Sequence, residues 1–481
     1  MNIVVVTILV YIIIVVVVCI QVLLSTKDSG KALAYLMLVI FIPVIGISFY
    51  FLFGLNYWKK RKYKNKISQN KNILDQVKTG IVDYDKSAIL DSDHPMAEHI
   101  ELSSMLVRDL GSPLTKGNKV KLLNNGEEKF PELIQAIEEA KHHIHLQYYI
   151  YRYDKIGTTI IELLIEKAKA GVKVRLIYDD FGSPSIDKET KKRMQDAGAA
   201  VYPFHKVNFY LFANRFNYRN HRKIVIIDGR TAFIGGINVS DSYINNGKNK
   251  LYWRDSHLRL DGPAVYYLQY LFMTDWKFCC SEAIKIEDLY FKSASNDGDD
   301  NFVQIVAGGP DSVLPTVLYS ILQLIYISKR EILITTPYFI PGDSCIDALC
   351  VSALSGLSVK LLVPEKGDSN IVAAASRSYY AKLLNAGVEI YHYQKGFIHS
   401  KTIVTDSQTT MIGTANMDNR SFELNFEVNA IIYNDKIAKD MRSIFFDDLK
   451  NAVKVDKQAW LSRSRYRQLP EKVAGLFSPV L

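Results

Sequence analysis

The sequence predicts an α/β protein in which two similar domains, each a mixed sheet flanked by helices, pack as a pseudo-dimer behind a two-helix transmembrane hairpin. Three observations support this prediction: two uncharged apolar stretches at the N-terminus, an alternation of helical and short apolar strand patterns after about residue 117, and an internal repeat with a long period. Such an alternation of helices and strands is typical of α/β architectures.

Both N-terminal stretches are long enough to cross a membrane. Residues 3–24 and 32–55 contain no charged side chain, and about 20 apolar residues in a helix span the hydrocarbon core of a bilayer. Pro43 and Gly46 in the second stretch are tolerated in spanning helices. A cleavable signal peptide is the alternative for the first stretch, but a basic start is missing and a second apolar stretch follows. We therefore expect two transmembrane helices within residues 1–58.

A basic connecting region, residues 59–117, follows the second stretch. Its first part holds a cluster of cationic residues: Lys59, Lys60, Arg61, Lys62, Lys64 and Lys66. By the positive-inside rule, this cluster places the C-terminal part of the chain in the cytoplasm, and it would also attract anionic lipid. The net charge of +9 favours acidic lipids, phosphate-bearing substrates or nucleic acid without choosing among them. The five cysteines form no paired zinc spacing and are expected to be reduced.

The internal repeat divides the remaining chain into two halves. Residues 144–151 (IHLQYYIY) correspond to residues 332–340 (ILITTPYFI), and each is followed by a helical pattern, a glycine and another strand pattern. A small, polar and acidic stretch between the halves is typical of a linker. We therefore expect domains packed face to face, with boundaries at 118–291 for the first domain, 292–300 for the linker, 301–456 for the second domain and 457–481 for a C-terminal tail.

Each half also contains the motif H-x-K-x-x-x-x-D, followed by glycine and then asparagine at the same spacing. The two sets are His221, Lys223, Asp228 and Asn238 in the first half, and His399, Lys401, Asp406 and Asn416 in the second. One such match occurs by chance in roughly a few per cent of chains of this length, but two identically spaced copies inside a repeat make coincidence negligible.

Strand geometry predicts how one motif is arranged. The β-branched run at 223–227 predicts a strand, on which His221 and Lys223 point to the same face. Asp228 then begins a hairpin turn that brings Asn238 beside the histidine, so a structural role suits this aspartate and its counterpart Asp406 better than direct catalysis. A histidine that attacks phosphorus, with Lys and Asn as donors to the phosphoryl oxygens, suits phosphoryl transfer. The second histidine can protonate the leaving alkoxide and later deprotonate the acceptor.

This duplicated motif resembles the signature of the phospholipase D superfamily. Several longer blocks, and the two apolar stretches, resemble the bacterial cardiolipin synthases, so the likeness covers nearly the whole chain. The blocks are residues 220–229 (NHRKIVIIDG), 233–243 (FIGGINVSDSY), 253–265 (WRDSHLRLDGPAV), 336–343 (TPYFIPGD), 397–406 (FIHSKTIVTD) and 413–430 (GTANMDNRSFELNFEVNA).

The resemblance implies an activity and roles for individual residues. Two phosphatidylglycerol molecules would give cardiolipin and glycerol through a phosphohistidine, at a bacterial cell membrane and without a metal, a cofactor or nucleic acid. His221 would be the nucleophile and His399 the general acid and base. A downstream carboxylate would orient each histidine, with Asp255 available in the first half and Glu427 in the second.

Alternatives remain open at this point. The same chemistry with water or another alcohol would make a phospholipase D or an enzyme like a phosphatidylserine synthase, while the basic charge leaves room for a membrane-tethered nuclease. A catalytically dead lipid-binding scaffold is disfavoured by the two intact motifs. His142, His143 and His145 resemble a metal cluster, but alternation on a strand would send His142 and His145 to opposite faces. Aromatic residues that end strands could border a cleft or fill the core: Tyr148, Tyr149, Tyr338 and Phe339.

Overall fold

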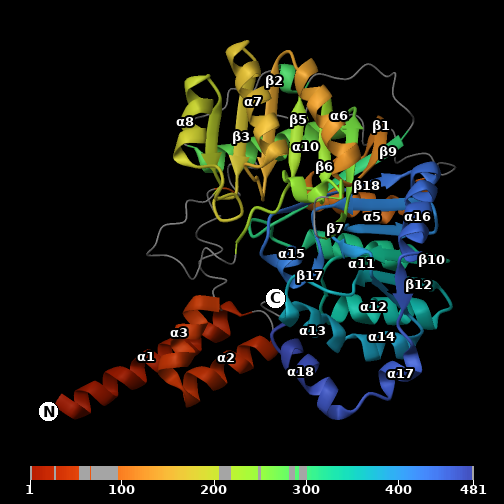
Figure 1. The fold of residues 1–481 in the computed structure, drawn as a ribbon. Helices are drawn as coiled ribbons and strands as arrows, with labels where there is room; N and C mark the ends of the chain where they lie inside the picture. Colours follow the sequence, from red (N-terminus) through yellow and green to blue (C-terminus); the bar gives the residue numbers. More distant parts are fainter. Residues whose placement is uncertain are drawn as a thin grey trace.

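The computed structural model describes residues 3–26, 29–53, 66, 96–204, 218–247, 251–280, 288–291 and 301–478. The predicted linker at 292–300 and the basic residues at 59–64 lie outside these ranges. The chain forms a short group of N-terminal helices and a large body of sheets and helices, both visible in Figure 1.

The N-terminal helices differ from the predicted hairpin of two long helices. Helix α1 (Ile3–Ser25) is the one helix among the described residues that is long and apolar enough to cross a membrane. The second apolar stretch is divided into α2 (Ser29–Phe41) and α3 (Pro43–Phe53). Proline lacks the N–H that a continuous helix would use, and the chain bends so tightly that a Cβ on Gly46 would lie 2.2 Å from the Leu38 carbonyl oxygen. Pro43 therefore interrupts what the sequence predicted as one helix.

The body is built on a mixed sheet that contains 15 strands within the described part of the chain. The first half contributes the order β1-β8-β6-β5-β2-β3-β4, and the second half the matching order β9-β18-β16-β15-β10-β12-β13, with β19 added at the edge. In each half, three strands run parallel, β2-β3-β4 and β10-β12-β13, and the others are antiparallel. The prediction of an α/β protein with mixed sheets is confirmed.

The strand bounds show where each half begins and ends. In the first half they are β1 (Thr115–Asn124), β2 (His143–Tyr148), β3 (Lys173–Tyr178), β4 (Ala200–Pro203), β5 (Ile224–Ile227), β6 (Thr231–Gly235) and β8 (Ser256–Asp261). In the second half they are β9 (Asn301–Gly308), β10 (Glu331–Thr335), β12 (Ser358–Pro364), β13 (Glu389–Tyr393), β15 (Thr402–Thr405), β16 (Thr409–Gly413), β18 (Glu427–Tyr433) and β19 (Ala452–Lys454). Two short pairs lie outside the main sheet: β7 (Tyr252–Arg254) with β14 (Gly396–Ile398), and β11 (Phe339–Ile340) with β17 (Met417–Asp418).

Helices cover the sheet and fill the space between the halves. They are α5 (Ile100–Leu110), α6 (Asn125–Glu139), α7 (Lys155–Lys169), α8 (Lys188–Asp196), α10 (Ala264–Cys279), α11 (Thr316–Ile327), α12 (Asp343–Leu354), α13 (Asn370–Ser378), α14 (Tyr380–Ala386), α15 (Asn419–Glu423), α16 (Asp435–Leu449), α17 (Lys457–Leu461) and α18 (Arg465–Gly475). Helices α6, α7 and α8 pack on the outer side of the first half, and α5, α11, α12 and α14 pack on the outer side of the second.

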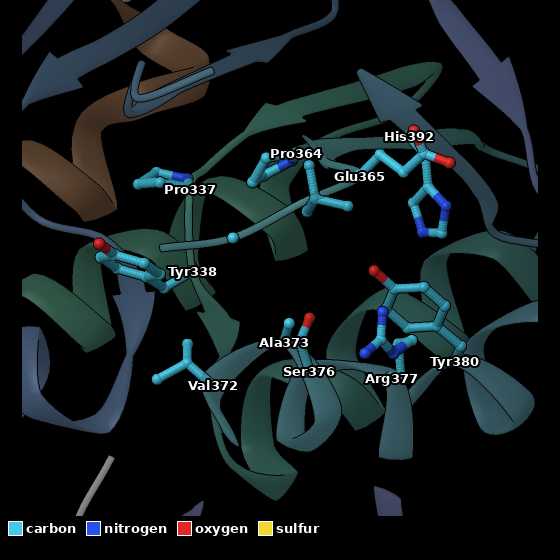
Figure 2. Close-up of a pocket in the computed structure, with 12 residues that line it drawn as sticks. Pro337, Tyr338, Pro364, Glu365, Val372, Ala373, Ser376, Arg377, Tyr380 and His392 are labelled. Atoms are coloured by element: carbon cyan, nitrogen blue, oxygen red, sulfur yellow. The ribbon is translucent and has the colours of Figure 1, made fainter. Parts of the chain in front are cut away.

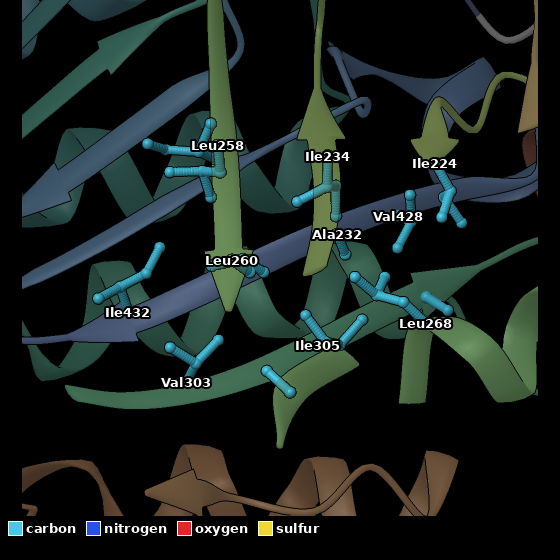
Figure 3. Packing of buried hydrophobic residues seen from close by; sticks show 14 of the residues in the cluster. Ile224, Ala232, Ile234, Leu258, Leu260, Leu268, Val303, Ile305, Val428 and Ile432 are labelled. Carbon is cyan, nitrogen blue, oxygen red and sulfur yellow. The ribbon is translucent and has the colours of Figure 1, made fainter. Parts of the chain in front are cut away.

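The two halves share one central hydrophobic core. Ile234 and Leu258 from the first half are buried in the same cluster as Ile305 and Val428 from the second, together with helices α10 and α16, and Figure 3 shows strands of both halves crossing there. The halves are also joined edge to edge, because β1 pairs with β9. At this seam, Asn118 and Asn301 each donate a side-chain hydrogen bond to the other's carbonyl, at 3.2 and 2.8 Å.

Candidate active site

The two motif histidines lie at equivalent places, just before β5 and β15. The motif strands begin at Ile224 and Thr402, one residue after each lysine, so the strand predicted from residue 223 starts slightly later in the structure. His221 and His399 are both buried. Each histidine therefore stands at the end of a central strand, where the two halves meet.

Backbone pairing between the halves holds both histidine segments. Strand β14, which precedes His399, runs parallel to β7 of the first half, and the His399 N–H donates to the Arg254 carbonyl at 2.7 Å. The corresponding exchange in the other direction joins Asn220 and Phe426 in a parallel bridge, with the His221 N–H donating to the Phe426 carbonyl at 3.0 Å. Each histidine is thus clamped to the segment that leads into the carboxylate of the opposite half.

Each imidazole is bonded to the carboxylate of the other half. His221 Nδ1 lies 2.9 Å from Glu427 Oε2, and His399 Nδ1 lies 2.7 Å from Asp255 Oδ2. The sequence had offered Asp255 to the first half and Glu427 to the second, so the observed pairs are crossed. A carboxylate at Nδ1 fixes the tautomer in which Nδ1 carries the proton and Nε2 presents a lone pair. Both rings are therefore oriented for chemistry at Nε2.

The motif lysines are buried, and each folds back onto its own motif. Lys223 Nζ donates to the His221 carbonyl at 2.8 Å, and Lys401 Nζ donates to the His399 carbonyl. Burial, together with the charge of the other lysine, lowers the pKa of Lys223 to about 7. Burial also lowers the pKa of Lys401 to about 8, partly offset by Asp255 and Glu427. The positive charges of the two ammonium groups thus repel each other, and a bound anionic phosphate would offset this repulsion.

The surroundings favour the neutral form of both histidines. Burial lowers the pKa of His221, and Glu427 offsets part of that effect. Burial and the nearby Lys401 lower the pKa of His399 to about 3, against the opposing influence of Asp255. A neutral imidazole is the form that can attack phosphorus or accept a proton.

The motif asparagines hydrogen-bond to groups other than the motif histidines, and their role toward a phosphate stays a prediction. Asn238 donates to the Tyr243 hydroxyl at 2.9 Å and accepts from the Ile150 N–H at 3.1 Å, and the Tyr243 ring centre lies 6.1 Å from that of His399. The structure thus links Asn238 to the histidine of the opposite half. Asn416 donates to Asp418 at 3.1 Å, and its Oδ1 is buried without a hydrogen-bond partner among the described residues.

The motif aspartates lie at the hairpin turns, away from the histidines, and their carboxylates accept hydrogen bonds from backbone N–H groups. Asp228 accepts the N–H groups of Lys141, His142 and His143 at 2.8–2.9 Å. Asp406 accepts three successive N–H groups at 2.7–2.8 Å in the same way, those of residues 329–331. Both aspartates have positive φ angles, 52° and 54°, which aspartate tolerates better than most residues. These contacts support the structural role expected for them, at the start of β2 and β10.

Aromatic rings surround the histidines unequally. Tyr149 lies 5.0 Å from His221 between ring centres, whereas Trp253 and Phe397 lie 5.6 and 5.9 Å from His399. Among the aromatics with two open interpretations, Tyr149 borders the site, and Tyr148 and Phe339 are core residues, 1% and 0% exposed.

Tyr338, the remaining aromatic of that group, lines a pocket in the second half. Figure 2 shows Tyr338 at one side of this pocket and Arg377, Tyr380 and His392 at the other. The Tyr338 hydroxyl donates to Asp368 at 2.6 Å. Helix α13 forms the wall that carries Ser376 and Arg377.

The histidines near β2 form a packed cluster, and one detail of their prediction is wrong. The rings of His142 and His145 were expected on opposite faces, yet both lie near Tyr290, at 5.8 and 5.4 Å between ring centres. The reason is that β2 begins at His143, so strand alternation does not extend to His142. His143 and His145 both contact Gln269 Oε1 at 3.2 Å, as satisfied core residues do.

Sequence reasoning missed a buried ionic network behind the first motif. Lys66, expected in the membrane-facing cluster, is 2% exposed and pairs with Asp275 at 2.9 Å and Asp311 at 2.5 Å. Asp275 also accepts from Arg222, the residue between His221 and the motif lysine, at 2.7 Å. Nothing in the local composition separates Lys66 from its neighbours in the cluster. This contact ties Lys66 of the connecting region to the body of sheets and helices.

Comparisons with known proteins identify relatives over almost the full length. The family described as cardiolipin synthase, PLD-like domain, matches residues 133–276 and 321–449, and the family described as phospholipase D-nuclease N-terminal matches residues 8–54. Cardiolipin synthase 2 of Bacillus cereus is 40% identical over 462 residues, which make up 96% of this chain and 88% of that protein. The cardiolipin synthase of Geobacillus kaustophilus is 39% identical over 460 residues, 95% of this chain and 90% of that protein.

A solved structure supports the fold independently. The crystal structure of phosphatidylserine synthase from Haemophilus influenzae has a TM-score of 0.58 and 13% identity, covering 76% of this chain and 95% of that one. At this level of identity the likeness concerns the fold alone. The N-terminal family match and the apolar helix α1 together indicate that the chain is associated with a membrane.

Proposed function

Since the chain belongs to the cardiolipin synthases of the phospholipase D superfamily, we propose that it transfers a phosphatidyl group from one phosphatidylglycerol to another, giving cardiolipin and glycerol. The observation that carries the mechanism is the crossed pairing of His221 with Glu427 and of His399 with Asp255. It supports a single reaction centre to which each half supplies one imidazole and one carboxylate.

In the first step, His221 Nε2 attacks the phosphorus of the first phosphatidylglycerol. The bond from phosphorus to the head-group glycerol oxygen breaks, and the departing oxygen takes a proton from His399. The negative charge of the bound phosphate raises the pKa of His399 above its value in the empty site, so that this imidazole can carry the proton it donates. The step leaves a phosphatidyl group on His221 and a neutral His399.

In the second step, His399 accepts the proton from a terminal hydroxyl of the second phosphatidylglycerol. The resulting oxygen nucleophile attacks the phosphorus, the phosphorus–nitrogen bond breaks, and His221 is released. Lys223 and Lys401 stabilise the charge on the phosphoryl oxygens in both steps. The pairs with Glu427 and Asp255 stabilise each imidazole when it becomes positively charged.

We propose further that two N-terminal segments span the membrane and that the catalytic body lies on the cytoplasmic side. Helix α1 supplies one segment, and the stretch that forms α2 and α3 supplies the other. The basic residues that follow this stretch in the sequence favour the cytoplasmic orientation. The anchor keeps the site close to its lipid substrates and raises their local concentration.

The product decides between this proposal and its nearest rivals. Purified enzyme in vesicles should receive phosphatidylglycerol labelled in both its phosphate and its head-group glycerol. Cardiolipin and free glycerol in equal amounts support transfer to a second phosphatidylglycerol. Phosphatidic acid as the main product would instead show that water is the acceptor, and formation of phosphatidylserine on addition of serine would show that another alcohol is used. A chelator should leave the rate unchanged.

A further inference from the structure

The C-terminal helix α18 presents a row of exposed apolar side chains. Tyr466, Leu469 and Val473 follow one another at spacings of three and four, and the turn after the helix continues the row with Leu476 and Phe477. Residues at these spacings lie on one face of a helix. Tyr466 is 88% exposed and Leu476 is 77% exposed, so this row, which we call the α18 row, is apolar surface that the described part of the chain leaves uncovered.

A different side of α18 attaches it to the body. Ala474 is buried in a small cluster with Ile340 of β11 and Ala375 of α13, and a Cβ on Gly475 would lie 2.8 Å from Ser378 Oγ. Because Ala474 and Glu471 are the buried residues of this helix, its packed side is separate from the α18 row. The helix is therefore fixed in place with its apolar row pointing away from the body.

The charges on α18 are sorted in the same way. Its exposed ionisable residues are all basic: Arg465, Arg467 and Lys472. The acidic residue of the helix, Glu471, is buried and paired with Arg463 at 2.8 Å and Arg377 at 3.5 Å. The exposed side of α18 therefore combines apolar and cationic side chains, and its carboxylate is buried in ion pairs. Such a side complements a surface with an apolar interior and an anionic outer layer. An anionic bilayer has that character.

The segment that follows α18 contacts the chain just after the second motif. Ser478, just after the α18 row, accepts a hydrogen bond from Asn419 at 3.0 Å, and Asn419 follows β17, which starts one residue after Asn416. On the other side, β11 pairs with β17 and follows Tyr338. Helix α13, on which α18 packs, forms a wall of the pocket in Figure 2. Helix α18 thus lies next to a wall of this pocket.

We propose that α18 is an interfacial membrane helix, whose apolar row inserts among the acyl chains of an anionic bilayer and whose basic residues contact the lipid phosphates. It gives the body of sheets and helices a second attachment besides the N-terminal helices, and it holds β11, β17 and α13 close to the lipid surface. In Figure 1, α18 and the N-terminal helices are drawn at the same lower end of the molecule. The position of the helix does not depend on the proposed reaction, but its effect on turnover does.

Insertion can be measured without any catalytic activity. The full chain with Leu469→Trp is placed in phosphatidylglycerol vesicles, with and without brominated acyl chains, and the quenching of the wild-type tryptophans is subtracted. The matched control is Val351→Trp on α12, a site that is 59% exposed. We expect strong bromine quenching for L469W and little for V351W. Equal quenching of the two, or a solvent-exposed emission for L469W, overturns the proposal.

The charged residues should contribute separately. In the L469W background, Arg465→Glu with Lys472→Glu should weaken insertion into phosphatidylglycerol vesicles, by about five-fold for each basic residue lost. Insertion into neutral phosphatidylcholine vesicles should change far less. If the two lipids respond alike, lipid charge recognition by α18 is refuted.

Activity distinguishes the helix from the reaction it serves. Leu469→Asp with Val473→Asp should lower cardiolipin formation in vesicles by at least about ten-fold, while activity in detergent mixed micelles stays near wild type. Val351→Asp with Leu354→Asp on α12 is the matched control and should behave as wild type in both. Loss in micelles as well, or a change of oligomeric state caused by the α18 change, would overturn membrane docking. Normal insertion in an enzyme that forms no cardiolipin would contradict the proposed function instead.

Discussion

His221 and His399 occupy equivalent positions in the two halves, but their carboxylate partners are supported differently. Glu427 accepts, besides His221, the hydroxyl of Thr414 at 2.5 Å. Asp255 accepts, besides His399, the backbone N–H of Ser256 at 2.7 Å. The position equivalent to Thr414 is Gly236, where an added Cβ would lie 2.1 Å from Asp255 Oδ1. His221 is thus paired with a glutamate that a threonine hydroxyl also supports. His399 is paired with the shorter aspartate, and a glycine stands where that threonine would be.

The charged groups around the two imidazoles also differ, and they favour the protonated form more at His221 than at His399. After burial itself, the carboxylate Glu427 is the main influence on the pKa of His221, whereas the cation Lys401 is the main influence on the pKa of His399. His399 also has the rings of Trp253 and Phe397 beside it. We infer that this difference suits His221 to the proposed role of nucleophile and His399 to the proposed role of general acid and base, in which bound phosphate raises the pKa of its imidazole.

The largest expected effect is the loss of either histidine. His221→Ala and His399→Ala should each reduce cardiolipin formation by at least about 10⁴-fold, as removal of a nucleophile or its acid–base partner does in other enzymes. A phosphatidyl ester of nitrophenol should distinguish the roles of the two histidines, because this leaving group needs no proton. A burst of nitrophenolate should persist in H399A and vanish in H221A. Bursts in both variants would contradict the assigned difference.

Loss of one lysine should have the next largest effect. Lys223→Met and Lys401→Met should each lower kcat by about 10²–10³-fold if the ammonium groups stabilise charge on the phosphoryl oxygens. The pKa values of about 7 and about 8 mean that the protonated share of each lysine falls as the pH rises through this range. In K223M, the alkaline limb of the kcat/KM profile should therefore move toward the pKa of Lys401, about 8. An alkaline limb that is the same in the wild type and both variants would exclude the lysines as its cause.

The crossed carboxylates are expected to matter less than the lysines. Glu427→Gln should slow formation of the phosphatidyl-enzyme, and Asp255→Asn should slow steps that need proton transfer by His399, each by about 10–100-fold. Rapid-quench kinetics with the nitrophenyl ester separates these steps. The burst, which reports formation of the phosphatidyl-enzyme, should be slower in E427Q and unchanged in D255N. Thr414→Val serves as a milder variant, with an expected loss of about five-fold. Reversal of the E427Q and D255N effects would mean that the histidine roles are exchanged.

The smallest effect on catalysis is expected at the motif aspartates, where the two halves are alike. Asp228→Ala and Asp406→Ala each remove the acceptor of three backbone N–H groups and should lower the free energy of unfolding by about 1–3 kcal/mol. The kcat of the folded variants should stay close to wild type. Asp228→Asn and Asp406→Asn, which suit the left-handed turn, should be milder in a denaturation series. A large drop in kcat without a loss of stability would assign these aspartates to the chemistry.

The sequence predicted what depends on local pattern and on repetition. The apolar stretches, the mixed-sheet class and the matching positions of His221 and His399 all follow from spacing within a few residues or between equivalent segments. The crossing of the carboxylates does not, because it depends on the pairing of β7 with β14 and of Asn220 with Phe426. Such contacts join segments that lie far apart in the chain, and strand periodicity carries no information about them.

Two other differences have equally physical causes. Pro43 was acceptable within a spanning helix on composition alone, but the chain bends there and forms α2 and α3. Lys66 has the same local context as the other basic residues after the apolar stretches, and its burial is decided by Asp311, 245 positions away, together with Asp275. Burial of a charge depends on its partners, and these become visible only in the folded chain.

The most direct test of the central claim is to locate the covalent intermediate. Wild-type enzyme is mixed with the nitrophenyl ester labelled in its phosphate, quenched in alkali within one turnover, digested and mapped by mass spectrometry. The account predicts that the labelled phosphate is held by an alkali-stable phosphorus–nitrogen bond on His221 alone, retained in H399A and absent in H221A. Label on His399, or on neither histidine at any time within the turnover, would contradict it.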